Sequence, residues 1–198
     1  DRSAQTVALE HGGSVPYDAL IIATGSRPRP LPVEGAELEG VFDLRDLADV
    51  ERIRPQMVAG RKLVIVGAGY IGLEAAAVAR QLGLEVTVLE MEERVLARVT
   101  SPIMSQFFAD EHTRQGADIR TGARLAALKG EDGKVTEAVL ADGTELSADI
   151  VLVGIGILPN VELAEAAGID CSNGILTDED ASTNAPRIFA AGDCAART

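Results

Sequence analysis

The stretch from residue 62 to residue 90 limits the possible folds of this chain more than any other. It reads K-L-V-I-V-G-A-G-Y-I-G-L-E-A-A-A-V-A-R-Q-L-G-L-E-V-T-V-L-E. Residues 63–66 form a short apolar run with β-branched side chains, which is typical of a buried parallel strand. Residues 70–82 predict a helix, and residues 85–89 predict the next strand. One apolar helix face is expected from Ile71, Ala75, Val78, Ala79 and Leu82.

The glycines between the first strand and the helix have the spacing G-x-G-x-x-G. Gly67 allows a tight turn, Gly69 allows a pyrophosphate to approach the backbone, and Gly72 allows close packing of helix and strand. The helix N-terminus offers free N–H groups to phosphates, so Tyr70 and Ile71 are also expected at the cofactor. Glu90 closes the second strand, where a carboxylate can bind both ribose hydroxyls and repel a 2′-phosphate. The pattern predicts NAD(H) binding, with a plain strand–helix turn with packing glycines as the alternative.

Composition narrows the class of protein. Apolar residues make up 46% and charged residues 25% of the 198, as in globular proteins. The net charge of −13 disfavours nucleic acid and anionic membranes as partners. Cys171 and Cys194 fit no zinc or C-x-x-C spacing, so we expect no metal site and reduced thiols, typical of a cytoplasmic protein. We expect no membrane span, because the longest apolar stretch holds Glu74 and three glycines.

Elsewhere the pattern predicts strands at residues 6–9, 17–23, 118–121, 150–153 and 188–191. Residues 24–30 and 31–60 are expected to be connections, the second holding a short helix at residues 46–54. Ser101 and Asn160 are the expected N-caps of helices that end near residues 115 and 167. Residues 124–129, 134–140 and 145–146 predict an antiparallel meander. The fold class is therefore α/β, with a parallel sheet and an antiparallel meander.

An internal repeat links two distant segments. Residues 7–28 align without a gap on residues 138–159, with identical residues at five positions and similar strand and turn order. The second copy closes the domain that begins with the glycine motif. The first copy is therefore expected to close another nucleotide-binding domain, whose own glycine motif would precede residue 1. The sequence accordingly reads as an excerpt of a longer protein.

Four motifs in a fixed order carry a family resemblance: Y-D-A-L-I-I-A-T-G-S-R-P-R-P-L-P, V-G-A-G-Y-I-G-L-E, V-G-I-G-I-L-P-N and F-A-A-G-D-C-A. Together they resemble the FAD-dependent pyridine nucleotide-disulfide oxidoreductases. Within that superfamily the chain looks like the NADH:ferredoxin reductases of the putidaredoxin reductase type. The motifs R-V-T-S-P and H-T-R-Q-G-A-D-I-R-T-G add to the subfamily resemblance.

The resemblance implies a domain order. Residues 1–40 would be the late part of the first FAD-domain segment, and residues 41–59 a connector. Residues 60–159 would be the NAD-binding domain, and residues 160–198 the return to the FAD domain. The FAD site is expected to be incomplete, because the FAD glycine motif and a C-terminal domain are missing from the sequence.

The resemblance also assigns residue roles. Thr24 and Gly25 resemble backbone neighbours of FAD, Arg45 an arginine that reaches FAD, and Asp193 the acid that bonds the ribityl chain. From the residues alone, Arg45 could equally be an exposed arginine and Asp193 a turn residue. Glu74 resembles the residue beside the nicotinamide carboxamide, and Gly156 lies near the same ring. Glu74 is the one residue given a catalytic role, and its alternative is a carboxylate that interacts with the helix dipole.

The implied reaction passes hydride from NADH to FAD and then single electrons to a ferredoxin or rubredoxin-type protein. Such an excerpt is expected to be inactive alone. Two other kinds of function remain open. One is a nucleotide-binding flavoprotein module with a signalling role, similar to apoptosis-inducing factor. The other is a related enzyme, an NADH oxidase or a nitrite reductase component. A redox cysteine pair preceding residue 1 also remains open.

Overall fold

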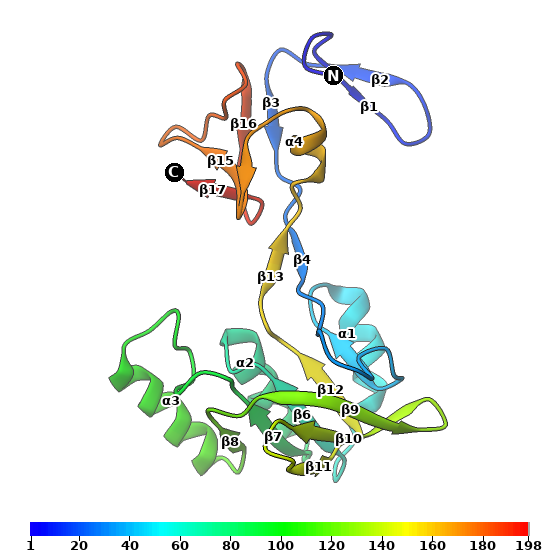
Figure 1. The fold of residues 1–198 in the computed structure, drawn as a ribbon, viewed down its shortest axis with the longest axis vertical. Helices are drawn as coiled ribbons and strands as arrows, with labels where there is room; N and C mark the ends of the chain where they lie inside the picture. Colours follow the sequence, from blue (N-terminus) through cyan, green and yellow to red (C-terminus); the bar gives the residue numbers. More distant parts are fainter. Residues whose placement is uncertain (198) are drawn as a thin grey trace. The chain divides into compact units, whose positions relative to one another are not determined.

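The computed structural model describes residues 1–197, which form two compact units (Figure 1). Unit 1 combines Asp1–Arg27 with the residues from Ile157 onwards, and unit 2 is Pro28–Gly156. The chain therefore passes between the units twice, after Arg27 and after Gly156. The segment predicted as a connector at residues 41–59 lies within unit 2.

Unit 2 is built on a parallel sheet with the strand order β5-β12-β6-β7-β8. The strands are β5 (Val41–Asp43), β6 (Lys62–Val66), β7 (Glu85–Leu89), β8 (Asp118–Arg120) and β12 (Ile150–Val153). Along β6, Leu63 and Ile65 belong to one core cluster, whereas Val64 and Val66 belong to another. A sheet buried on both faces explains why β6 and β12 are continuous apolar runs.

Each face of this sheet has its own cover (Figure 1). The cluster on one face includes residues of α2 (Tyr70–Gln81), α3 (Pro102–Arg114) and α1 (Leu47–Ile53), which continues into the 3-10 turn η1 (Arg54–Gln56). The cluster on the other face includes residues of the antiparallel meander β9 (Leu125–Glu131), β10 (Lys134–Leu140) and β11 (Glu145–Ser147). The predicted α/β class, with its parallel sheet and antiparallel meander, is confirmed.

The predicted apolar face of α2 is right for Ala79, which is buried, and for Ala75, which packs against the core, but wrong for the other three residues. The buried residues are Gly72, Leu73, Ala76 and Ala79, whereas Ile71, Val78 and Leu82 are 45%, 52% and 48% exposed. The helix is rich in alanine, so apolar residues surround it and periodicity alone does not select a face. Small residues face the sheet because the helix packs very closely against it. An added Cβ at Gly72 would lie 2.0 Å from the Gly67 carbonyl oxygen.

Unit 1 contains shorter elements, in which strands from both ends of the chain meet. They are β1 (Thr6–Ala8), β2 (Ser14–Pro16), β3 (Leu20–Ile22), β4 (Ser26–Pro28), β13 (Ile157–Pro159), α4 (Glu162–Ala166), β14 (Cys171–Ser172), β15 (Gly174–Thr177), β16 (Ile188–Ala190) and β17 (Ala195–Arg197). β3 pairs in parallel with β16, β4 pairs with β13, and β14, β15 and β17 form a third sheet. The predicted connection at residues 24–30 therefore contains a strand, β4.

The predicted cap of α4 is also wrong. Val161 occupies the N-cap position and makes no side-chain capping bond. The Asn160 side chain instead donates to the Thr24 carbonyl oxygen at 2.9 Å and accepts from Arg27 at 2.7 Å. Ser101 does occupy the N-cap position of α3, although its side chain makes no capping bond. Both cysteines are free thiols, with Cys194 buried.

The internal repeat is visible in the strand pairing. Thr6 pairs with Pro16 in the β1–β2 hairpin, and the aligned residues Glu137 and Ser147 pair in β10–β11. β2 and β4 align with β11 and β13 over their full lengths. The turn glycines Gly12 and Gly143 share a φ of +87°. The predicted repeat therefore holds at the level of register and backbone conformation.

Candidate functional site

A cradle of backbone lies where β6 leads into α2. Gly67 has φ +106°, and a Cβ there would lie 2.4 Å from the Gly154 carbonyl oxygen. Gly69 is the N-cap of α2, and a Cβ there would meet nothing within 4 Å. β7 and β8 lie on one side of β6 and β12 on the other, so the strand order reverses here. Open α/β sheets bind ligands at such a reversal, and the space beside Gly69 fits a pyrophosphate.

Glu90 lies beside this cradle, directly after β7. Its Oε2 accepts a hydrogen bond from the Ala68 N–H at 2.8 Å, and its Oε1 accepts one from the Glu92 N–H at 2.9 Å. The Glu90 backbone N–H also donates to the Arg120 carbonyl oxygen at 2.8 Å. The carboxylate is therefore held by the glycine loop itself, with lone pairs left to accept from ligand hydroxyls.

The loop after Glu90, residues 91–100, also contacts the glycine loop. The Leu96 N–H donates to the Ala68 carbonyl oxygen at 2.9 Å. Arg94 bonds the Thr100 and Ala97 carbonyl oxygens and the Ser105 hydroxyl. The sequence reasoning missed Arg94 and Leu96, since no spacing rule predicts which carbonyl oxygens an arginine binds.

Three expected site residues lie in the first turns of α2. Tyr70 is 56% exposed, Ile71 is 45% exposed, and the Glu74 side chain is also exposed. Gly156 follows β12, has φ +104°, and its carbonyl oxygen accepts from the Arg29 N–H at 2.9 Å. These side chains are accessible, and their contact with a nicotinamide stays a prediction.

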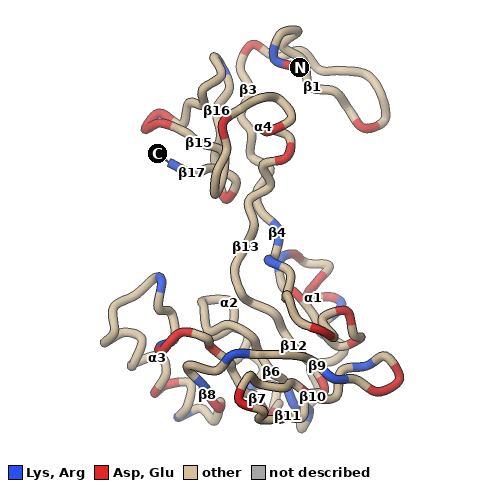
Figure 2. Tube along the Cα trace, in the orientation of Figure 1, with Lys and Arg blue, Asp and Glu red and all other residues tan. Residues whose placement is uncertain are grey.

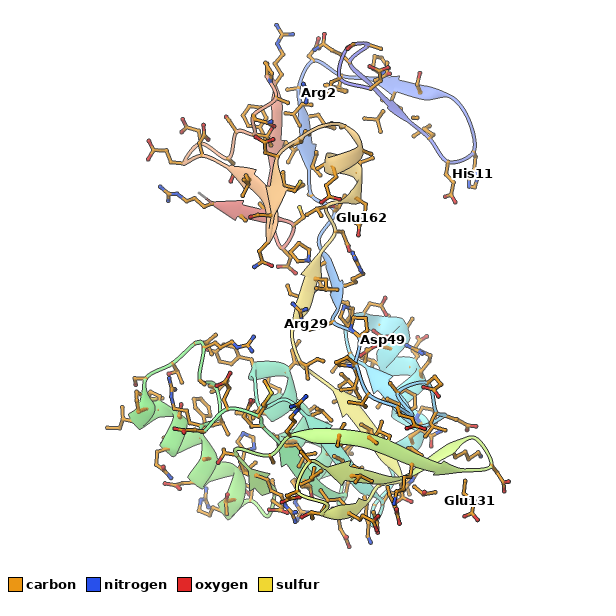
Figure 3. All side chains as sticks on the ribbon, in the orientation of Figure 1. Arg2, His11, Arg29, Asp49, Glu131 and Glu162 are labelled. Atoms are coloured by element: carbon orange, nitrogen blue, oxygen red, sulfur yellow. The ribbon has the colours of Figure 1, made fainter. Side chains whose placement is uncertain are left out.

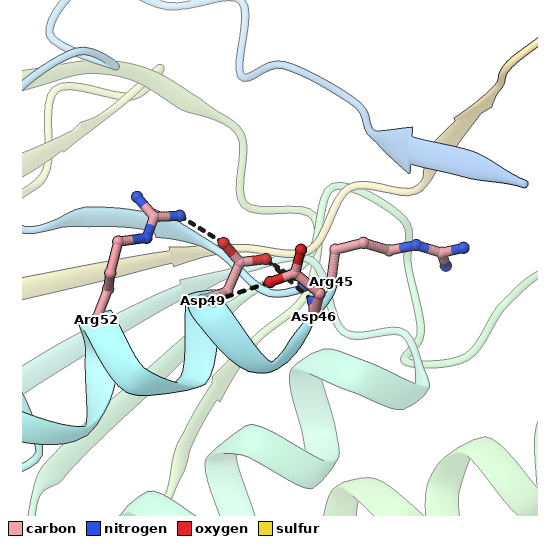
Figure 4. Close-up of polar contacts among 4 residues, drawn as sticks. All are labelled: Arg45, Asp46, Asp49 and Arg52. Atoms are coloured by element: carbon pink, nitrogen blue, oxygen red, sulfur yellow. Dashed lines mark hydrogen bonds and ion pairs between the residues drawn. The ribbon is translucent and has the colours of Figure 1, made fainter. Parts of the chain in front are cut away.

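Arg45 lies just before α1, and its side chain extends away from the start of that helix (Figure 4). Asp46 and Asp49 form a reciprocal capping box there, and Asp49 also bonds Arg52. Partial burial acts to raise the pKa of Asp49, but the bonds from Arg52, Arg45 and Asp46 outweigh it and hold that pKa below its usual value.

Asp43 was not among the expected site residues. It ends β5 at the carboxyl edge of the sheet, where it is aligned with Val153 of β12. Burial and then the charge of Asp49 raise the pKa of Asp43 above its usual value, against the effect of Arg52. The sequence around Asp43 shows no distinctive pattern. The position of Asp43 at the sheet edge depends on β5 pairing with β12, which is distant in the chain.

Unit 1 brings Thr24, Gly25 and Asp193 to one sheet edge. Parallel β3 and β16 end together, and the Ala191 N–H donates to the Ile22 carbonyl oxygen at 3.0 Å. Asp193 Oδ2 accepts from the Ser26 hydroxyl at 2.9 Å. Thr24 donates to the Asn160 carbonyl oxygen at 2.6 Å. This edge offers a carboxylate and backbone groups to a ligand with hydroxyls.

Asn160 is surrounded by further polar contacts in unit 1. Arg27, which bonds its side chain, also pairs at 2.8 Å with Glu162, labelled on α4 in Figure 3. The Asn160 N–H donates to the Gly25 carbonyl oxygen at 2.9 Å. These contacts hold the segment that carries Thr24 and Gly25 against the residues after β13, which gives that segment a fixed backbone.

Charges are distributed over both units, with Lys and Arg scattered among more numerous Asp and Glu (Figure 2). Within residues 1–197, no group of three or more His, Cys, Asp or Glu side chains is arranged to hold a metal ion. No helix in that same range is both long and apolar enough to cross a bilayer.

Comparison with known proteins gives a consistent result. The family model described as pyridine nucleotide-disulphide oxidoreductase matches residues 1–198. Putidaredoxin reductase CamA from Pseudomonas putida is 46% identical over 200 residues, covering 98% of this chain and 47% of that protein. Rhodocoxin reductase from Rhodococcus erythropolis is 44% identical, covering 99% and 46%. The chain thus spans about half the length of these curated relatives.

A solved structure agrees with these relatives. The ferredoxin reductase for the CYP199A2 system from Rhodopseudomonas palustris matches with a TM-score of 0.96 and 43% identity. That match covers 100% of this chain and 49% of the other.

Proposed function

Because the chain belongs to the pyridine nucleotide-disulphide oxidoreductase family, we propose that it is part of an NADH-dependent flavoprotein reductase. When bound, FAD accepts hydride from NADH and passes electrons on singly. The electron acceptor is a ferredoxin or rubredoxin-type iron–sulfur protein. The relatives named as putidaredoxin, rhodocoxin and rubredoxin reductases support this class of acceptor.

The proposed NADH site rests mainly on the hydrogen bond between the Glu90 carboxylate and the glycine loop. The Ala68 N–H donates to the Glu90 carboxylate at 2.8 Å, while the position of Gly69 leaves space at the helix N-terminus. The pyrophosphate would be held beside Gly69 at the N-terminus of α2, where Gly67 allows the turn and Gly72 the close packing, and Glu90 would accept from the adenosine ribose hydroxyls. A 2′-phosphate at that ribose is repelled by the same carboxylate, so NADH is preferred over NADPH.

Glu74 has the catalytic role in this proposal. It stands on the first turns of α2 with an exposed side chain, so it can hydrogen-bond a nicotinamide carboxamide without burying its charge. Tyr70, Ile71 and Gly156 are the further residues proposed beside the nicotinamide ring. These residues act by orientation, and none of them transfers a proton.

Unit 1 supplies part of the FAD site. Asp193 accepts from a hydroxyl of the ribityl chain, and Thr24 and Gly25 offer backbone groups to the flavin. By the family resemblance, Arg45 is a further residue proposed to contact FAD. In domain terms, the proposal assigns residues 1–40 and 160–198 to the FAD domain, residues 60–159 to the NAD domain and residues 41–59 to the connector. The compact units differ from these bounds, because they group residues 28–59 with the NAD-domain residues. The protein acts in the cytoplasm.

Cytochrome c reduction by the full-length protein tests this function. We expect NADH-dependent reduction that rises when an acceptor ferredoxin is added, and weak activity with NADPH. Oxygen consumption that matches NADH oxidation, with no response to ferredoxins or rubredoxins, would instead assign the protein to the NADH oxidases.

A further inference from the structure

We propose that Arg94 is a positioning residue for the NAD site. It holds the loop at residues 91–100 in place. That loop bonds the glycine loop through the Leu96 N–H, and it bonds the Glu90 carboxylate, which itself bonds Ala68, through the Glu92 N–H. The inference rests on the proposed function in one respect, namely that the cradle between β6 and α2 binds NAD(H).

The Arg94 guanidinium closes the loop on itself. One terminal nitrogen donates to the Thr100 carbonyl oxygen at 2.9 Å and to the Ser105 hydroxyl at 2.6 Å. The other donates to the Ala97 carbonyl oxygen at 2.7 Å. Ser105 is 2% exposed, and its hydroxyl donates a hydrogen bond to the Val95 carbonyl oxygen at 2.6 Å. Arg94 therefore connects residues 94–100 of the loop to the first turn of α3.

The loop needs this support because it contains a strained residue. Leu96 has φ +53° and is 3% exposed, so a branched side chain is buried in a left-handed conformation. Such residues persist only where their surroundings fix them, and they gather at functional sites. The Leu96 carbonyl oxygen accepts from the Val99 N–H at 3.0 Å and the Thr100 N–H at 3.2 Å. Thr100 is also a residue that Arg94 holds.

The strained residue contacts the cradle directly. The Leu96 N–H donates to the Ala68 carbonyl oxygen at 2.9 Å, and the Ala68 N–H donates to Glu90 at 2.8 Å. Both backbone groups of Ala68, which stands between the first two glycines and is fully buried, are therefore fixed by residues after β7. Loss of the Arg94 bonds leaves Leu96 free to relax, which removes one of the two bonds that set the peptide at Ala68.

By charge alone, an arginine near Glu90 could instead bind a 2′-phosphate. A phosphate ligand would be directed at the cofactor, whereas the Arg94 guanidinium bonds Ala97 and Thr100 of its own loop and Ser105 of α3. The two roles differ in outcome. Removal of a positioning residue weakens the binding of NAD⁺ and NADP⁺ by the same factor, whereas removal of a residue that binds the 2′-phosphate weakens the binding of NADP⁺ alone.

The test compares Arg94→Met with Arg80→Met in the full-length flavoprotein. Arg80 is a matched control, because it also binds backbone carbonyl oxygens, those of Leu84 and Gln115, but far along α2 from the glycine loop. Calorimetric titration gives the Kd of NAD⁺ and NADP⁺, and thermal denaturation gives Tm. We expect both variants to lower Tm, and Arg94→Met alone to raise both Kd values by roughly tenfold, the worth of one or two hydrogen bonds.

Two further variants test the inference if the Arg94→Met protein does not fold. Arg94→Lys keeps one charged donor and should give an intermediate Kd, and Ser105→Ala should raise Kd in the same direction. An unchanged Kd in all Arg94 and Ser105 variants, beside a wild type that binds NAD⁺, would overturn the inference alone. A wild-type protein that binds no NAD⁺ would overturn the proposed function as well.

Discussion

At the scale of single residues, Glu90 has two separable tasks. Its carboxylate accepts the Ala68 N–H and is also the expected partner of the ribose hydroxyls. Replacing Glu90 with alanine removes a charged acceptor, so NAD⁺ binding should weaken by about 1–2 kcal/mol. Removing the negative charge should also narrow the preference for NAD⁺ over NADP⁺. Calorimetry on both cofactors measures the two effects.

A matched control for this variant lies on the same strand. Glu85 begins β7, is exposed, and stands at the opposite end from Glu90. Glu85→Ala should leave both dissociation constants unchanged. Equal affinities for NAD⁺ and NADP⁺ in the wild type would contradict the ribose role of Glu90.

Glu74 tests orientation against helix stability. Glu74→Ala in the full-length protein should slow reduction of the flavin by NADH, because the nicotinamide is less well placed. Glu74→Gln should retain more rate, since an amide still hydrogen-bonds a carboxamide. Anaerobic stopped-flow absorbance measures the reduction rate directly. If both variants reduce at the wild-type rate and only Tm falls, Glu74 is merely a carboxylate near the positive end of α2.

At this scale the sequence predicted the features that depend on residues near one another in the chain and missed those that depend on contacts between distant elements. The turn at Gly67 and the place of Glu90 at the end of β7 follow from spacing within one strand–helix–strand unit. The strained Leu96, the bonds of Arg94 and the raised pKa of Asp43 depend on contacts between separate elements. The cofactor contacts of Tyr70, Ile71, Glu74 and Gly156 stay predictions.

At the scale of elements, two glycines at the junction of β6 and α2 should affect different properties, Gly72 the stability of the fold and Gly69 the affinity for NAD⁺. Gly72→Ala places a Cβ 2.0 Å from the Gly67 carbonyl oxygen, which is backbone and cannot move aside cheaply. We expect a loss of about 1–3 kcal/mol in the free energy of unfolding, as in other overpacked sites. Thermal or urea denaturation measures this loss.

Gly69→Ala should behave in the opposite way. Its φ of −79° suits alanine, and its Cβ would meet nothing within 4 Å, so stability should fall by less than about 1 kcal/mol. NAD⁺ affinity should fall roughly tenfold or more, because the methyl group occupies space that the pyrophosphate needs. Unchanged affinity in a folded Gly69→Ala protein would show that phosphate does not approach there.

Element positions followed well from the sequence, but their orientations did not. The pattern predicted α2, β7, β12 and the meander to within a few residues, because each has a strong local period or turn signal. The buried face of α2 was predicted only in part, because alanines surround the helix and periodicity alone did not separate the buried Gly72, Leu73 and Ala76 from the exposed Ile71 and Val78. β4, β5 and β13 were missed because each has three residues and depends on a partner distant in sequence.

At the scale of the whole molecule, the candidate FAD residue Asp193 and the candidate NAD residue Glu90 lie in different compact units. Asp193 belongs to unit 1, and Glu90 belongs to unit 2. Asp193→Ala in the full-length protein should lower flavin occupancy, because a ribityl acceptor is lost, while NAD⁺ affinity stays unchanged. The ratio of flavin to protein absorbance and NAD⁺ calorimetry give the two readings. A matching loss of NAD⁺ affinity would show that the units do not bind independently.

The repeat has a consequence for the order in which this chain folds as it is made. Each copy of the repeat pairs with a strand that follows the other copy in sequence. β5 follows the first copy but pairs with β12 of the second, and β16 follows the second copy but pairs with β3 of the first. On the ribosome, unit 2 can complete its sheet once β12 has emerged. Leu20 of β3 must wait for Ile188, and pairings so distant in sequence form slowly. Residues 1–27 therefore complete their sheet after unit 2 has done so, although they precede it in the chain, and they need protection from aggregation in the meantime.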